Sequence, residues 1–394
     1  MKNTLSTFRL ALAIMALLPS SALAGGFYYE GVYYGVLHDF FDTSLGVYGH
    51  ARVVNNGSTG CYSGDVVIPE LVPYADYFLH VTTIGKDAFN YCNDLTSVTL
   101  PNTITTIEET AFNGCSNLKS VNIPPSVTSM GQSVFSYCPS LTAIDIPDGV
   151  TSINYGTFWG CTKLKDVKLS NNITYIGMHA FSDCDSLSEI TLPGSLTTIA
   201  YEAFSGCDNL KHVTIPDSVT SIGPCAFRAC TGMKSLIIGK GVTIIDYYAF
   251  GGCNSLEDIV CKAITPPAMP ASGGFPQFTD YATPVLYVPA ASLEAYRASE
   301  YWGKFNTILS IEEIVGKHKG DVNRDGEINI ADTNSVIEVV IRGGNSGHTR
   351  VPDPDGEGWI DLADINDDGE VNLADVNALI SNILSNNQPC DVAN

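Results

Sequence analysis

The chain has 394 residues, with 42 acidic against 20 basic side chains and a formal net charge of −22. This length is enough for two or three domains with an apolar core. The negative charge argues against nucleic acid and anionic membrane surfaces as partners. The charge is also uneven, because the stretch from Asp321 to Asp375 holds 14 acidic residues and only three arginines. So local an excess predicts a bound cation there.

Residues 1–24 have the pattern of a cleavable secretory signal peptide. Lys2 and Arg9 supply positive charge, residues 10–18 are an apolar run, and residues 22–24 fit a small-residue cleavage site. No cysteine follows the apolar run, so a lipid anchor is not indicated. No later stretch is long and apolar enough for a transmembrane segment. We therefore expect an exported protein, secreted or held at the bacterial cell surface.

Residues 25–80 carry no clear repeat and are interpreted as an N-terminal cap. Residues 27–37 are rich in Tyr, Gly and Val and indicate β-structure, and residues 66–69 resemble the apolar-Pro endings of later turns. An uncovered end of a repeat array would expose core side chains and an unpaired strand edge. A β-rich cap is the expected solution.

Residues 81–270 are organised by a 23-residue repeat. Cysteine recurs at Cys92, Cys115, Cys138, Cys161, Cys184, Cys207, Cys230 and Cys253, with Phe three residues before each and Leu or Met three residues after. A fixed period of this length is the signature of a leucine-rich-repeat solenoid, mainly β. In the first copy we expect a strand with Val98 and Leu100 pointing inward, followed by a second apolar element at Ile104 and Ile107.

The cysteine column is expected to consist of buried thiols. Stacked turns lie ~4.8 Å apart, which a disulfide could bridge, but equivalent side chains in a ladder point the same way. A small apolar core residue is the better interpretation. Cys261 is expected in the core and Cys225 at the surface. The sequence leaves open whether Cys61 and Cys390 pair.

The repeat pattern, Leu-x-x-Val-x-Ile-Pro-x-x-Val-Thr-x-Ile-Gly-x-x-Ala-Phe-x-x-Cys, resembles the BspA-like (treponemal-type) leucine-rich repeats of secreted bacterial proteins. Residues 286–297 with Tyr301 and Trp302 resemble the segment that often closes such arrays, so residues 271–315 are expected to form a C-terminal cap. Within it, residues 290–305 suit a short amphipathic helix. The resemblance implies surface exposure and binding of protein or other cell-surface ligands, without catalysis.

The outward strand positions are expected to form an exposed sheet face. They are Ser97, Thr99, Ser120, Asn122, Ala143, Asp145, Asp166, Lys168, Glu189, Thr191, His212, Thr214, Ser235, Ile237, Asp258 and Val260. The middle of this face carries the most charge. The candidate ligand-contact patch is therefore Asp145, Asp166, Lys168, Glu189 and His212. An ordinary solvated face is the alternative.

Residues 321–394 are expected to form a small α-helical calcium-binding domain, after a linker at residues 316–320. Two loops place oxygen side chains with EF-hand spacing and a glycine at position 6, which favours two Ca²⁺ ions over magnesium. The candidate metal ligands are Asp321, Asn323, Asp325, Glu327, Asn329 and Asp332 in the first loop, and Asp364, Asn366, Asp368, Glu370, Asn372 and Asp375 in the second. Glu327 and Glu370 would contribute backbone carbonyls.

Each of these loops runs into an apolar helical pattern and has Asp at position 12, so the pair resembles a type I dockerin module. The resemblance implies docking to a cohesin-like partner through loop positions 10 and 11. Those positions hold Ile330 and Ala331 in the first loop and Leu373 and Ala374 in the second, where the best-known group has hydroxyl residues. An apolar contact would replace the usual one.

No motif of a catalytic site occurs in the chain. The seven histidines are scattered, and no nucleophile elbow, phosphate loop or zinc-spaced Cys/His set is present. The sequence therefore predicts a binding protein, not an enzyme. Its solenoid would recognise a protein or glycan ligand and its dockerin-like module would dock to a cohesin-bearing scaffold. The alternative is a non-catalytic accessory subunit of a polysaccharide-degrading assembly.

Overall fold

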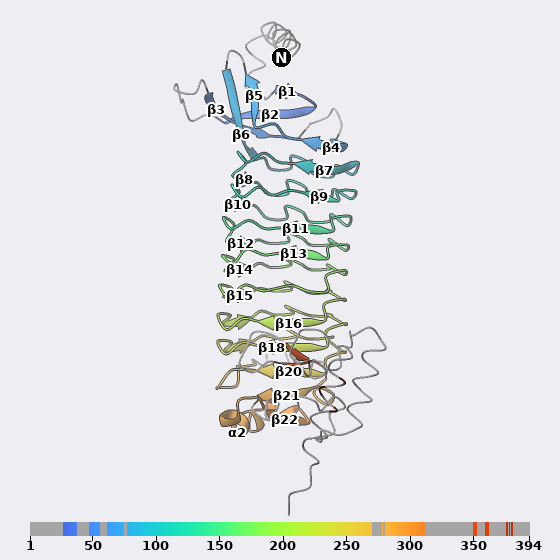
Figure 1. Cartoon of the computed structure of the whole chain (residues 1–394), viewed down its shortest axis with the longest axis vertical. Coiled ribbons are helices and arrows are strands. Elements are labelled where there is room, and N and C mark those ends of the chain that lie inside the picture. The colour runs from blue at the N-terminus through green and yellow to red at the C-terminus, as the bar shows by residue number, and fades with distance from the viewer. Residues whose placement is uncertain are drawn as a thin grey trace, which may run out of the picture.

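The structure is a computed structural model that describes residues 27–37, 47–55, 61–74, 77–269, 278 and 280–311, with short pieces at 350–352, 359–361, 376, 378 and 380. The predicted signal peptide, the linker at residues 316–320, both calcium loops and Cys390 lie outside the described residues. The described chain forms an elongated column of stacked turns between an N-terminal β-cap and a C-terminal helical end (Figure 1).

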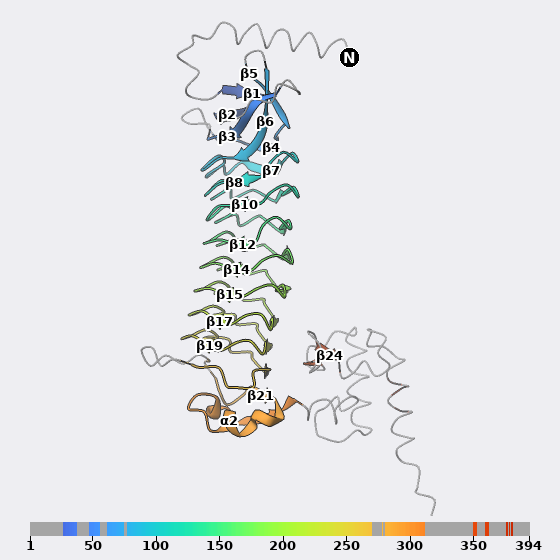
Figure 2. The same ribbon diagram turned by 90° about the vertical axis from the view of Figure 1, so that its left-hand side faces the viewer.

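Most turns of the column contribute one short strand to each of two rows of parallel strands, here called the first and the second ladder (Figures 1 and 2). The first ladder contains β4 (Gly64–Val67), β7 (Leu95–Thr99), β9 (Ser120–Val121), β11 (Ala143–Asp145), β13 (Asp166–Lys168), β16 (His212–Ile215), β18 (Ser235–Ile238), β20 (Asp258–Cys261), β21 (Val285–Val288) and β22 (Thr307–Ser310). The second contains β6 (Tyr77–Ile84), β8 (Thr106–Ile107), β10 (Ser129–Met130), β12 (Ser152–Ile153), β14 (Tyr175–Ile176), β15 (Thr198–Ile199), β17 (Ser221–Ile222) and β19 (Ile244–Ile245).

The register of the ladders follows the 23-residue period. His212 pairs with Ser235, and Ser235 pairs with Asp258, so equivalent residues of successive turns lie side by side. The predicted inward positions are buried accordingly, with Val98, Leu100, Ile104 and Ile107 all at most 3% exposed. The mainly β solenoid predicted from the repeat is confirmed.

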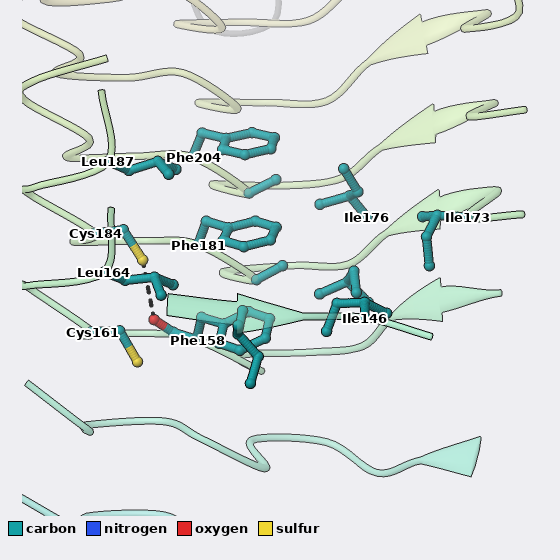
Figure 3. Packing of buried hydrophobic residues seen from close by; sticks show 14 of the residues in the cluster. Ile146, Phe158, Cys161, Leu164, Ile173, Ile176, Phe181, Cys184, Leu187 and Phe204 are labelled. Atoms are coloured by element: carbon teal, nitrogen blue, oxygen red, sulfur yellow. Dashed lines mark hydrogen bonds between the residues drawn. The ribbon is translucent and has the colours of Figure 1, made fainter. Parts of the chain in front are cut away.

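The core of the solenoid is a continuous stack of phenylalanine rings flanked by Leu, Ile and Val. Ring centroids of successive turns are 5.0 to 5.7 Å apart and nearly parallel from Phe89 to Phe250, and the stack continues onto Phe278. Figure 3 shows Phe158, Phe181 and Phe204 one above another beside the leucine column. Each ring is covered by the turns above and below it, so a single turn could not bury its own core.

The cysteine column is joined to the phenylalanine column by a repeated hydrogen bond. The thiol of Cys184 donates to the backbone carbonyl of Phe158, one turn earlier, at 3.3 Å (Figure 3). The same bond recurs from Cys115 to Cys253 at 3.0 to 3.3 Å. A thiol is small enough for this site and gives the carbonyl a second donor, since the carbonyl of Phe158, for example, also accepts the backbone N–H of Cys161 at 3.1 Å.

We expect these thiols to be inert in the folded protein. Burial raises the pKa of the Cys161 thiol to about 12, and burial likewise raises the pKa of Cys184 and Cys230. The reactive species is the thiolate, so at pH 8 a disulfide reagent should titrate the ladder cysteines only after denaturant has unfolded the solenoid. Rapid labelling of more than one ladder thiol in the native protein would contradict the buried assignment.

Cys92 departs from the prediction for its column, because it forms a disulfide with Cys61 of the N-terminal cap. The first repeat has no preceding phenylalanine to supply an acceptor carbonyl to its thiol. Cys61 reaches the sulfur from outside the array, so the unfavourable geometry between equivalent ladder positions does not apply. The Cα atoms of the two residues are 5.0 Å apart.

Cys225 is also placed differently from the prediction, because it is buried, at 4% exposure, and not at the surface. It occupies the turn position that His179 and Glu202 hold in the two preceding repeats. Those side chains are only 16% and 19% exposed, since each lies against its neighbours along the column. Cys261 is fully buried, as predicted.

The two ends of the solenoid are closed by different structures. At the N-terminus, β1 (Phe27–Tyr29), β2 (Val32–Leu37) and β3 (Val47–Val53) form an antiparallel meander, and β3 then pairs parallel with β6, which also pairs with β5 (Leu71–Tyr74). The segment that resembled a turn ending, residues 66–69, begins in β4, which pairs with β7 and so starts the first ladder.

The C-terminal closure is less helical than predicted. A 3₁₀ turn η4 (Ala290–Ser292), a short helix α2 (Leu293–Arg297) and a second 3₁₀ turn η5 (Trp302–Lys304) replace one continuous helix. The break lets Tyr296 and Trp302 both point into the end of the array, where they donate hydrogen bonds to the carbonyls of Ala263 and Pro267. A separate hairpin pairs β23 (Arg350–Pro352) with β24 (Trp359–Asp361).

Candidate functional site

The outward face of the first ladder is interrupted in the middle of the solenoid. β11 and β13 pair only with each other, and residues 188–191 of the next turn form no strand. The ladder resumes at β16 and continues to β22. The interruption falls in the region where the sequence places the most charge.

A shallow hollow of about 290 Å³ lies at this interruption. It is lined by Asp145, Lys165, Asp166, Val167, Lys168, Ser188, Glu189, Ile190 and Thr191. The structure thus brings together four of the five residues predicted for the contact patch. Register explains part of the arrangement, since Asp145 lies beside Lys168 on the paired strands.

The charged groups of the hollow are available for a ligand. Asp145, Asp166, Lys168 and Glu189 are all exposed. Among the residues that the structure describes, no ion pair joins these carboxylates to Lys165 or Lys168. The hollow therefore presents both signs of charge at fixed positions along two strands.

His212, the fifth predicted patch residue, does not line the hollow. It lies one strand further along, partly buried, with Nδ1 2.5 Å from the hydroxyl of Ser235. Because it contacts Ser235 on the neighbouring strand, His212 belongs to the sheet face next to the hollow.

The prediction of an exposed face is wrong for the last turns of the solenoid. The four outward positions there are buried: Ser235, Ile237, Asp258 and Val260. Ile237 and Val260 form a second small apolar cluster with Ile311, and Tyr287 packs against it. Ile311 follows β22 directly and covers the outward side of the sheet at this point. In the sequence, the apolar residues Ile237 and Val260 at outward positions indicate that this part of the sheet is covered.

The repeat array matches a known protein family. Residues 82–211 and 197–265 match the family described as BspA type Leucine rich repeat region, in six copies. Over residues 82–265 the solenoid is therefore similar to BspA-type repeat regions. No curated protein matches the chain.

Three solved structures are similar to this chain. The leucine-rich repeat protein of T. pallidum is 25% identical over 59% of this chain and 90% of that chain, with a TM-score of 0.42. The pneumococcal vaccine antigen PcpA is 19% identical, covering 73% and 98%, with a TM-score of 0.32. A leucine-rich cell surface protein from Faecalibacterium prausnitzii A2-165 is 23% identical, covering 73% and 94%, with a TM-score of 0.32.

Lys165 is a member of the hollow that the sequence reasoning missed. It directly follows the leucine anchor of its BspA-type repeat, a position that holds lysine also at Lys119, Lys211 and Lys234. This position was not counted among the outward residues because it precedes the strand. The recurring lysine was the signal available in the sequence.

The predicted metal and docking residues cannot be placed on this surface. Both calcium loops, with Ile330, Ala331, Leu373 and Ala374, lie outside the described residues. Within the described part of the chain, no group of three or more His, Cys, Asp or Glu side chains is arranged to hold a metal ion. In the same part, no helix has the length and apolar character needed to cross a membrane.

Proposed function

We propose that this chain is an exported binding protein whose BspA-type solenoid holds its ligand at the hollow between β11, β13 and residues 188–191. The observation that supports this most is the set of exposed charges of both signs, with no ion pair among them in the described residues, where β13 has no strand partner in the next turn. Charged groups on a rigid array give specificity, because a partner must match their positions.

A protein segment is the favoured ligand for the hollow. Three carboxylates and two lysines favour a partner that offers basic and acidic side chains in return. A neutral glycan would leave these charges without partners of opposite sign. The area around the hollow is small, so we expect a contact of a few residues extended by the neighbouring sheet face.

The hollow can be tested by capture of a panel of extracellular-matrix proteins and a glycan array by the full chain. We expect Lys168→Glu to weaken binding of the retained ligand at least about tenfold, the effect of losing a hot-spot side chain. Asp145→Lys should act similarly, because it reverses a charge beside Lys168.

Lys163→Glu is the matched control for these variants. Lys163 is exposed and close in sequence, but it does not line the hollow. Equal losses from Lys163→Glu and Lys168→Glu would indicate a general charge effect and would count against the hollow. Unchanged binding by both hollow variants would place the ligand elsewhere.

Export to the cell surface or medium is supported by two independent features. The first is the signal-peptide pattern of residues 1–24. The second is the Cys61–Cys92 disulfide, since such bonds persist in oxidising compartments and are rare in the cytosol. The proposal places the solenoid where extracellular proteins can reach it.

We further propose that residues 321–394 bind two Ca²⁺ ions and dock the protein to a cohesin-like partner. Support comes from the two complete sets of oxygen ligands in the sequence. Because loops of like charge repel without a cation, we expect EDTA to abolish one calorimetric transition and leave that of the solenoid in place. A thermogram unchanged by EDTA would contradict the calcium assignment, and failure of the full chain to retain any cohesin would contradict the docking.

A further inference from the structure

A row of exposed side chains, two of them tyrosines, runs along the solenoid at positions that do not line the hollow. The row follows the position directly before each repeat cysteine. In the first, third and fifth repeats this position holds Tyr91, Tyr137 and Asp183, and in the second, fourth and sixth it holds Gly114, Gly160 and Gly206. The row therefore has a period of two turns, twice that of the core.

The alternating glycines make room for the side chains of the row. A Cβ at Gly114 would lie 2.5 Å from Cδ1 of Tyr91, and a Cβ at Gly160 would lie 2.9 Å from Cδ1 of Tyr137. Each tyrosine ring thus lies against the backbone of the next turn. The rings are held in place from below but remain 64% and 49% exposed at Tyr91 and Tyr137.

The backbone at these positions is unusual for a tyrosine. Tyr91 and Tyr137 have φ values of 57° and 55°, in the left-handed region that glycine adopts with less strain. A non-glycine residue there costs on the order of 1–2 kcal/mol. Packing of the core does not require the rings, because glycine occupies the same position in alternate turns. The core can therefore be packed without these rings.

The row is continued by a polar and aromatic cluster. Trp159 lies between Tyr137 and His179. Its ring is tilted by 39° to that of Tyr137, with the centroids 5.2 Å apart, and stacks on the imidazole of His179 at 5.0 Å. Its indole Nε1 donates to Asp183 Oδ2 at 3.0 Å, which fixes the carboxylate at the end of the row. His179 Nδ1 lies 3.2 Å from Glu202 Oε2, and Tyr155 and Tyr201 each meet the imidazole edge-on.

The spacing of the row suggests the shape of its ligand. Turns are separated by the strand spacing, so Tyr91 and Tyr137 lie about 10 Å apart along the solenoid axis, as do Tyr137 and Asp183. This distance is close to the length of two pyranose residues in an extended β-1,4-linked chain. A linear polymer with a two-residue repeat would meet equivalent groups at every second turn.

We propose that the row Tyr91, Tyr137 and Asp183 is a binding site for a neutral linear polysaccharide lying along the solenoid axis. The C–H groups of a pyranose face pack on the electron-rich face of an aromatic ring, and rigid tyrosines lose little entropy on binding. Asp183 Oδ1 accepts a sugar hydroxyl, since only Oδ2 is used by Trp159. The carboxylates Asp183 and Glu202 repel acidic glycans, which makes the ligand neutral.

Native gel electrophoresis of the full chain through soluble glucomannan, xylan and mixed-linkage β-glucan tests this site. We expect at least one of these polysaccharides to retard the protein. Tyr137→Ala should weaken the retardation at least about tenfold, as expected for an aromatic anchor, whereas Tyr137→Phe should retain it. Tyr175→Ala is the matched control, because Tyr175 is also exposed, at 37%, but belongs to β14 in the second ladder.

Two further measurements distinguish loss of binding at this row from loss of binding at the hollow and from misfolding of the variant. Lys168→Glu should leave the retardation unchanged, so the two surfaces can fail independently. Polysaccharide should also change the tryptophan fluorescence of the native protein, and Trp159→Phe should remove that change, because Trp159 lies beside Tyr137. The proposal is overturned if none of the three polysaccharides retards the wild-type chain, or if Tyr137→Ala is retarded as strongly as Tyr175→Ala.

Discussion

Replacing Phe158 with alanine should lower the free energy of unfolding by about 3–5 kcal/mol. Phe158 is fully buried and stacks between Phe135 and Phe181, with centroids 5.7 and 5.2 Å away. Its removal loses the transfer free energy of a large ring and leaves a cavity in the middle of the stack. The neighbouring turns are held in register by the strand pairs β11–β13 and β12–β14 and can collapse only partly into that space.

Phe158→Ala should also reduce the cooperativity of unfolding. A solenoid is held together by contacts between adjacent turns, so a weak central interface separates the array into two halves. We expect denaturant unfolding of Phe158→Ala, followed by circular dichroism, to become broader or biphasic. Tyr175→Ala, which removes an exposed ring from β14, should change the midpoint little. A loss below about 1 kcal/mol for Phe158→Ala would contradict a close-packed stack.

Breaking the Cys61–Cys92 bond should destabilise the N-terminal cap by about 3–4 kcal/mol. The bond closes a loop with a sequence separation of 31, and the loss of chain entropy in the unfolded state predicts a value of this size. Cys92 also belongs to the first turn of the core, so the bond joins the cap to the array that it covers.

Reduction of the wild-type chain and the variant Cys61→Ser should therefore give the same result. Both should release hydrogen-exchange protection in β6 and β7 before protection is lost from the central turns. Reductant should have no added effect on Cys61→Ser, which serves as the control for reduction of other bonds. If Cys61→Ser retained wild-type protection in the cap, the bond would have no part in closing the solenoid.

The sequence predicts the repeating part of this molecule well because each position recurs eight times in the same environment. Phe158 and Cys184 can be assigned to the core from their columns alone, before any contact is known. The hydrogen bond from each thiol to the preceding phenylalanine carbonyl is not visible in the sequence. It gives cysteine a buried hydrogen bond that another small apolar residue in the column would lack.

The departures occur where a repeat lacks its usual neighbours. Cys92 has no phenylalanine in the preceding turn and pairs with a cap residue instead, which periodicity could not reveal. Ile237 and Val260 are covered by Ile311, a residue 51 or more positions further along the chain. The aromatic row was missed for another reason, since its two-turn period is invisible when the repeats are averaged into one consensus.

The candidate contact patch was predicted in composition but not in shape. Alternation along the strands identified Asp145, Asp166, Lys168 and Glu189, and all four line the hollow. The hollow itself arises because residues 188–191 form no strand. The residue pattern does not predict this local irregularity. His212 lies on the continuing ladder beyond that break and so takes part in the sheet instead.

Hydrogen exchange of the full chain, with and without the matrix protein that it captures, tests the central claim most directly. If the ligand binds at the hollow, exchange should slow at residues 143–145, 166–168 and 188–191, which come from three successive turns. Residues 175–176 in the second ladder should exchange as before. Slowed exchange confined to the second ladder or to the caps, with the hollow unchanged, would contradict the account.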